Sequence, residues 1–107
     1  MEFKVVFLNK KVEKDTLNFP SGILANFIHI VEMIEEFGSA LGMPYTSKIE
    51  KDLYEIRAKG VEGIGRSIFC TTKGKKIVIL HSFIKKTQKI PKKEIQIARK
   101  RLKEFKK

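Results

Sequence analysis

The stretch that decides the fold is Ile77-Val78-Ile79-Leu80-His81-Ser82-Phe83-Ile84-Lys85-Lys86-Thr87-Gln88-Lys89-Ile90-Pro91. Its first four residues are all apolar, which indicates a central strand covered on both faces. The chain then becomes cationic, and Pro91 is suited to the first position of a helix. The stretch therefore predicts a strand, a basic turn and a helix, with positive charge at the rim of a packed sheet.

A hairpin is expected to lead into this turn. Residues 66–72 and 76–84 are rich in β-branched and aromatic side chains, and Lys73-Gly74-Lys75 joins them as a hairpin turn would. Residues 3–8 predict a first strand by the same composition. Residues 53–57 alternate in the strand manner, with Tyr54 and Ile56 on one face and Leu53, Glu55 and Arg57 on the other.

Helical segments are expected in the first half of the chain. Residues 9–15 predict one or two turns that end before Pro20. Residues 22–37 predict a longer helix, with Ser21 as its N-cap and Gly38 at its C-cap. One apolar stripe of this helix should face a core. Its members are Ile23, Phe27, Ile30, Ile34 and Phe37.

The C-terminal helix is expected to be basic, with one apolar stripe formed by Ile95, Ala98, Leu102 and Phe105. Residues 42–47 predict a loop, and the glycines at 60, 63 and 65 mark a turn. The order is β-α-α-β-β-β-α, which is typical of a small α+β protein. A chain of 107 residues is expected to form a single domain, residues 1–107.

Charge is distributed unevenly. The net charge is +11 overall, and it runs from −2 over residues 1–52 through +4 over residues 53–80 to +9 over residues 81–107. This gradient indicates a basic end that meets a polyanion, although a solvated helix face is the alternative. With one cysteine, no apolar run of about 20 residues and no signal-peptide pattern, we expect a cytoplasmic protein without a membrane partner.

Metal and nucleotide chemistry find little support in the sequence. His29, His81 and Cys70 have no ligand-like spacing, so neither a metal nor another cofactor is expected. His29 is interpreted as a structural or surface residue, and Cys70 as a small buried hydrophobe. The turn glycines lack the strand and helix that flank a nucleotide-binding loop.

The candidate chemistry lies in the cations Arg57, Arg66, Lys85, Lys86 and Lys89. An arginine in a strand needs a carboxylate or an external anion, and a salt bridge to Glu55 or Glu62 is the structural alternative. If the anion is an RNA phosphate, guanidinium groups suit the charge that develops on phosphorus. A lysine among other cations has a lowered pKa and can accept the 2′-hydroxyl proton.

Adjacent strand residues point to opposite faces, so we expect only one of Lys85 and Lys86 to be catalytic. Phe83 can stack on a base, although a strand phenylalanine is more often part of the core.

These residues resemble the HigB-type toxins of the RelE/ParE superfamily, which are often labelled phage-derived proteins. The resemblance rests on residues 53–57, 65–69 and 77–91, with Glu94, Ile95 and Ala98 after them. It is strong over residues 53–101, while the N-terminal half agrees mainly in its order of elements. The motif at residues 83–89 is highly specific in this setting.

The resemblance implies a RelE-like fold, with helices on one face of a twisted, mainly antiparallel sheet and a basic face opposite. It also implies the toxin of a type II toxin–antitoxin system: a metal-independent endoribonuclease that cleaves mRNA on the ribosome. Its partner would be a helix-turn-helix antitoxin of HigA type, through which alone it would reach operator DNA. Carried over by position, the catalytic set is Arg57, Arg66, Lys85 and Lys86, and the RNA-binding set is Phe83, Thr87, Lys89, Lys92 and Lys93.

Two positions depart from the family pattern. Ile90 replaces a threonine that can cap the helix, a loss of about 1 kcal/mol, and Cys70 stands where an aromatic residue is common. Two other functions stay open at this point. One is a ParE-like inhibitor of DNA gyrase that cuts no RNA, and the other is a basic RNA-binding module.

Overall fold

The computed structural model describes residues 3–85 and 89–107. The elements, in chain order, are β1 (Lys4–Phe7), α1 (Lys10–Leu17), α2 (Ser21–Phe37), the short 3-10 helix η1 (Gly38–Leu41), β2 (Thr46–Glu50), β3 (Leu53–Gly60), β4 (Gly63–Thr71), β5 (Lys76–Lys85) and α3 (Lys92–Phe105). The α+β class is confirmed, and so is the expected order of elements, apart from one additional strand.

The sheet has the strand order β1-β5-β4-β3-β2. β1 runs parallel to its neighbour β5, whereas β5 with β4, β4 with β3 and β3 with β2 pair in the antiparallel direction. The expectation of a loop at residues 42–47 was wrong at its end, because β2 begins at Thr46 and pairs with β3. This edge strand reads Thr-Ser-Lys-Ile-Glu, and charged side chains are tolerated there because one side faces solvent.

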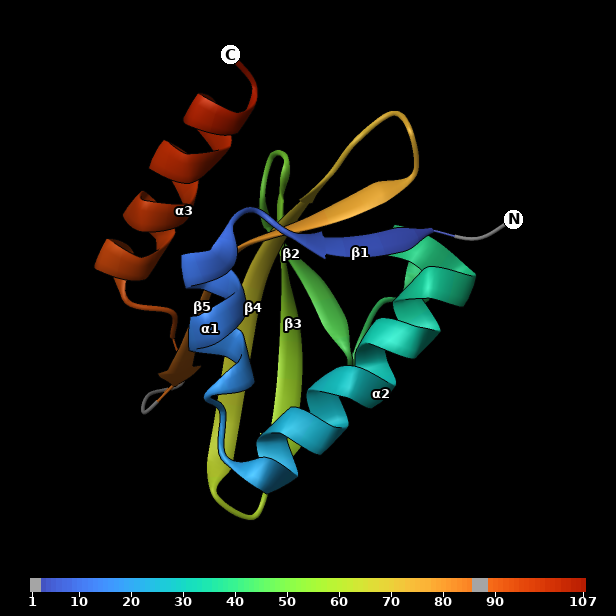
Figure 1. Cartoon of the computed structure of the whole chain (residues 1–107), viewed down its shortest axis with the longest axis vertical. Helices are drawn as coiled ribbons and strands as arrows, with labels where there is room; N and C mark the ends of the chain where they lie inside the picture. Colours follow the sequence, from blue (N-terminus) through green and yellow to red (C-terminus); the bar gives the residue numbers. More distant parts are fainter. Residues whose placement is uncertain (1–2, 86–88) are drawn as a thin grey trace.

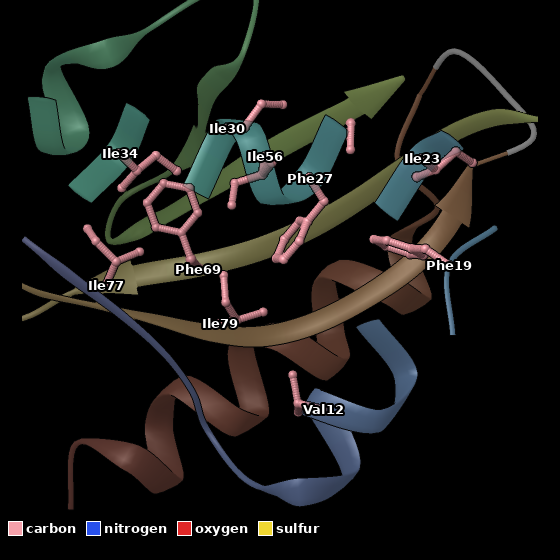
Figure 2. Packing of buried hydrophobic residues seen from close by; sticks show 11 residues of the cluster. Val12, Phe19, Ile23, Phe27, Ile30, Ile34, Ile56, Phe69, Ile77 and Ile79 are labelled. Atoms are coloured by element: carbon pink, nitrogen blue, oxygen red, sulfur yellow. The ribbon is translucent and has the colours of Figure 1, made fainter. Parts of the chain in front are cut away.

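Two apolar cores lie on opposite faces of the sheet. The larger one packs α1 and α2 on the sheet (Figures 1 and 2), with Phe27 and Ile30 of α2 meeting Ile56 and Phe69 of the strands. The smaller core lies under α3, and its buried members are Leu53, Ile68, Cys70, Val78, Leu80 and Ala98. The run at residues 77–80 alternates between the two cores, which confirms a central strand covered on both faces.

Helix α2 begins at Ser21 itself, so the predicted N-cap was wrong by one residue: Pro20 occupies that position without a side-chain hydrogen bond. The Glu62 carboxylate accepts from the backbone N–H of Gly22 at 3.0 Å instead. A Cβ at Gly60 would lie 2.6 Å from the backbone nitrogen of Ile23, so this close approach requires glycine. The glycine at position 38 ends the helix as predicted, with φ of 68°.

The expected apolar stripes were too long by one residue each. Phe37 is 53% exposed and Phe105 is 41% exposed, and each is the last residue of its helix. Helix α3 begins at Lys92, so Pro91 stands at the N-cap position instead of the first helical one, and no side chain caps the helix. In residues 3–85 and 89–107, no helix is both long enough and apolar enough to span a membrane.

Candidate active site

A single β-bulge decides which residues of β5 reach the site. Between β4 and β5 the register pairs Ile68 with His81 but Phe69 with Ile79, so Leu80 has no partner. Leu80 packs in the core under α3, and His81 contacts Glu94 and Arg101 of the same helix. The bulge therefore shifts the alternation by one position and sends Lys85, with His81, to the face opposite α1 and α2.

The strand ladders bring the site together on this face. Arg57 of β3 is directly opposite Arg66 of β4, and Arg66 is opposite Phe83 of β5. Glu55 precedes Arg57 by two residues on the same strand and points the same way. Three of the expected catalytic residues, Arg57, Arg66 and Lys85, thus gather around one carboxylate.

This cluster is unusually buried for charged residues. Glu55 is 4% exposed, Arg66 6% and Lys85 8%. The Arg66 Nη1 atom donates to Glu55 Oε1, and Arg57 Nε lies 3.8 Å from the same oxygen. The salt bridge of Glu55 with Arg57 is therefore present, although Arg66 is the closer partner. One carboxylate balances three cations, which leaves a local charge of about +2 with every group ionised.

Two guanidinium donors of the cluster lack an acceptor. Within the part of the chain that the structure describes, Arg57 Nε and Arg66 Nε are buried and have no hydrogen-bond partner. A buried donor without a partner costs about 1–3 kcal/mol. The planar fork of a guanidinium matches two phosphate oxygens, so the arrangement suits a phosphate group as the missing acceptor.

The surroundings of Lys85 weaken its hold on a proton. Burial lowers the pKa of the Lys85 ammonium below its ordinary value, and Arg66 and Arg57 lower it further, against the opposing effect of Glu55. Burial also lowers the pKa of the Arg66 guanidinium, and the negative charge of the Glu55 carboxylate acts against this lowering. A larger fraction of Lys85 than of an ordinary lysine is therefore neutral at a given pH, as a general base requires.

The remaining expected residues lie around this cluster. Phe83 is half-buried, packs against the core under α3 and stacks on His81 with ring centroids 5.5 Å apart. Lys89, Lys92 and Lys93 are exposed just before and within the first turn of α3. Lys86 and Thr87 lie outside the described residues. Base stacking by Phe83 and RNA contacts by these residues stay predictions.

His81 has a structural role that was not predicted from the sequence. Its Nε2 atom lies 2.7 Å from Glu94 Oε1, and its Nδ1 atom lies 3.3 Å from Arg101 Nη1. Arg101 also donates to the carbonyl of Leu80 at 2.8 Å. Both ring nitrogens thus have partners on α3, so His81 ties this helix to β5. Glu94 and Arg101 are seven residues apart and therefore lie on one face of α3, and this spacing is the sequence pattern that could have indicated the contact.

The described residues contain no group of three or more His, Cys, Asp or Glu side chains that could hold a metal ion. His29 is exposed and Cys70 is 1% exposed, in agreement with their interpretation as surface and core residues. Burial raises the pKa of the Cys70 thiol. The charged groups that the structure brings together at this site are guanidinium, ammonium and carboxylate groups.

Comparisons with known proteins agree with this fold. The structure matches a mutant of the E. coli toxin RelE in the free state, with a TM-score of 0.68 and 14% sequence identity. The match covers 95% of this chain and 99% of the RelE chain. It also matches the archaeal RelE–RelB complex from Pyrococcus horikoshii OT3, with a TM-score of 0.57, 23% identity, and coverage of 78% of this chain and 96% of the other.

No curated protein matches the sequence. The family model described as Phage derived protein Gp49-like (DUF891) matches residues 14–103. This match spans both helical layers, all but the first strand and every residue of the charged cluster. The chain therefore belongs to the phage-derived Gp49-like family, and it has the fold of the RelE toxins.

Proposed function

We propose that this protein is the toxin of a type II toxin–antitoxin system, of HigB type, and that it cleaves mRNA on the ribosome without a metal ion. The observation that carries the proposal is the convergence of Arg57, Arg66 and Lys85 on one face, with two buried guanidinium Nε atoms that have no acceptor among residues 3–85 and 89–107. The likeness to RelE in fold supports a toxin of this class.

In the proposed reaction the scissile phosphate lies against the Arg57 and Arg66 guanidinium groups. Neutral Lys85 accepts the proton of the 2′-hydroxyl, whose oxygen attacks phosphorus. The guanidinium groups stabilise the additional negative charge of the pentacoordinate phosphorus, because their donors are already oriented and little water competes for them. No external nucleophile is needed for this step.

The second half of the reaction needs an acid. The P–O5′ bond breaks, the leaving 5′-oxygen takes up a proton, and the products are a 2′,3′-cyclic phosphate and a 5′-hydroxyl. The proton that Lys85 has taken from the 2′-hydroxyl passes to this 5′-oxygen, so one lysine serves as base and then as acid. Lys86 is the alternative to Lys85 in the proposed catalytic set, and Phe83, Thr87, Lys89, Lys92 and Lys93 are the proposed contacts to RNA.

The proposed partners follow from the same class. A RelE–RelB complex is among the similar structures, and we propose a cognate antitoxin here, of helix-turn-helix HigA type, that alone brings the toxin to operator DNA. The site of action would be the cytoplasm, where mRNA and ribosomes meet. We propose that residues 1–107 act there as a single domain.

The test is induction of the wild type, Arg66→Ala and the double variant Lys85→Ala/Lys86→Ala in a host without antitoxin. Lys100→Ala, an exposed lysine on α3, is the matched control. We expect growth arrest with new mRNA 5′ ends, seen by primer extension, for the wild type and the control only. Circular dichroism of the purified variants checks that they remain folded.

Purified protein with an mRNA, with and without ribosomes, then tests ribosome dependence and the chemistry of the ends. A 2′,3′-cyclic phosphate and a 5′-hydroxyl formed only with ribosomes agree with the proposal. Intact mRNA together with a DNA-damage response contradicts it in favour of a gyrase inhibitor. RNA binding without growth arrest contradicts it in favour of a simple RNA-binding module.

A further inference from the structure

Glu55 is the one acidic side chain that contacts the cations of this cluster within the described residues. Its two ion pairs both use Oε1: Arg66 Nη1 donates to it, and Arg57 Nε lies 3.8 Å away. The carboxylate is 4% exposed, so water screens these interactions weakly. A group that binds both arginines at one oxygen fixes where their remaining donors point.

The arginine donors that do not bind Glu55 indicate what the carboxylate does in this site. Arg66 is 6% exposed, and in the described part of the chain its Nε atom is buried without a partner, as is the Nε atom of Arg57. A carboxylate placed only to neutralise the pair would be expected to satisfy these donors by a bidentate bond. Glu55 instead holds the two guanidinium groups by one oxygen and leaves a buried donor on each.

The same carboxylate acts on Lys85. Among the described residues, the charges of Arg66 on β4 and Arg57 on β3 lower the pKa of the Lys85 ammonium, and the charge of Glu55 on β3 raises it. On the α3 side, Glu94 pairs with His81. Removal of the Glu55 charge would therefore leave Lys85 beside two uncompensated cations.

We propose that Glu55 is a positioning residue of the site, which orients Arg57 and Arg66 toward a phosphate and sets the charge that surrounds Lys85. It does not touch the reacting atoms. The consequence for RNA cleavage rests on the proposed function, but the effect on Lys85 does not, and it is measurable without RNA.

Glu55→Gln separates charge from hydrogen bonding, because the amide oxygen still accepts from Arg66 while the negative charge is lost. NMR titration of the lysine side chains, with Lys85 assigned from the signal missing in Lys85→Arg, gives the protonation midpoint. We expect the midpoint of Lys85 to fall by about one pH unit in Glu55→Gln. An unchanged midpoint would overturn the proposal.

The matched control is Glu50→Gln, which removes a glutamate that also pairs with an arginine, Arg99, at 2.7 Å on the surface. It should leave the Lys85 midpoint in place, and an equal fall there would overturn the proposal as a general charge effect. Glu55→Asp keeps the charge but withdraws it by one methylene, so its midpoint should lie between those of the wild type and Glu55→Gln. If Glu55→Gln does not fold, an unchanged midpoint in Glu55→Asp overturns the proposal.

The pH dependence of RNA cleavage supplies the second readout. In Glu55→Gln the rise of the rate with pH should move to lower pH by the same interval as the Lys85 midpoint, and Glu55→Asp should restore part of the difference. A cleavage profile that keeps the wild-type midpoint overturns the proposal. Absence of cleavage by the wild type contradicts the proposed function instead, and the NMR midpoints still decide the part of Glu55.

Discussion

Arg57 and Arg66 stand directly opposite each other across the β3–β4 ladder. Like charges at directly opposed positions destabilise a sheet, so this pair needs compensation. Glu55 supplies part of it, because its Oε1 accepts from Arg66 and lies 3.8 Å from Arg57 Nε. The compensation is incomplete. A site with excess positive charge and with two donors that find no partner among the described residues is suited to an anionic ligand.

The first prediction concerns the stability of this ion pair. Arg66→Met removes the closer partner and leaves a buried carboxylate, so we expect a loss of about 3 kcal/mol in the free energy of unfolding. The double variant Glu55→Gln/Arg66→Met should lose clearly less than the sum of the single variants. Urea denaturation of the four proteins gives the coupling energy. Strictly additive losses would show that the pair is not coupled.

A second prediction concerns the N-terminus of α2. Hydrogen bonds from the backbone N–H groups of Gly22, of Glu62 itself and of Ile23 lower the pKa of the Glu62 carboxyl below 4.5. Because the pKa of this carboxyl is lower in the folded state than in the unfolded state, its ionised form stabilises the protein at pH values above the unfolded-state pKa. This contribution is lost as the pH falls below 4.5. The melting temperature of Glu62→Gln should thus be lower than that of the wild type at pH 7, and the difference should shrink at acidic pH.

The control for this second prediction is Glu36→Gln, an exposed glutamate at the other end of the same helix. It should change the melting temperature little at either pH. A difference between Glu62→Gln and the wild type that stays constant down to acidic pH would argue against a charged cap.

Local sequence patterns were sufficient for much of the fold. The apolar run at residues 77–80 predicted a strand between two covered faces, because successive side chains of a strand point to opposite faces and an apolar residue at every position needs cover on both. The alternation at residues 53–57 correctly placed Glu55 and Arg57 on one face. The edge strand β2 was missed because Thr46–Glu50 is stabilised by backbone pairing with β3 and carries few apolar side chains.

Features that depend on distant residues were out of reach. The bulge at Leu80 shifts every later side chain of β5 to the other face, and nothing in an all-apolar run marks the position of the extra residue. The cap of α2 comes from Glu62, which is 40 residues away from Gly22 in sequence. The cations of the site were identifiable from their types, but the face they share depends on that bulge.

A third prediction concerns the attachment of α3. The His81 imidazole bridges the side chains of Glu94 and Arg101, so its loss removes two contacts between β5 and the helix. We expect faster amide hydrogen exchange in α3 of His81→Ala, with little change in α2, because these polar contacts hold α3 on β5 at two points seven residues apart. Ser21→Ala is a control outside this region. Equal protection of α3 in the variant and the wild type would contradict the assignment.

The fourth prediction separates the charge of Lys85 from its proton transfer. Lys85→Arg keeps a cation at the rim of the sheet, but a guanidinium cannot give up its proton near neutral pH. RNA binding should therefore persist while the cleavage rate in single-turnover measurements falls by about 100-fold or more. Lys100→Arg, on the exposed side of α3, should keep the wild-type rate. If Lys85→Arg cleaves RNA as fast as the wild type, Lys85 contributes only charge, and the base must be sought elsewhere in the chain.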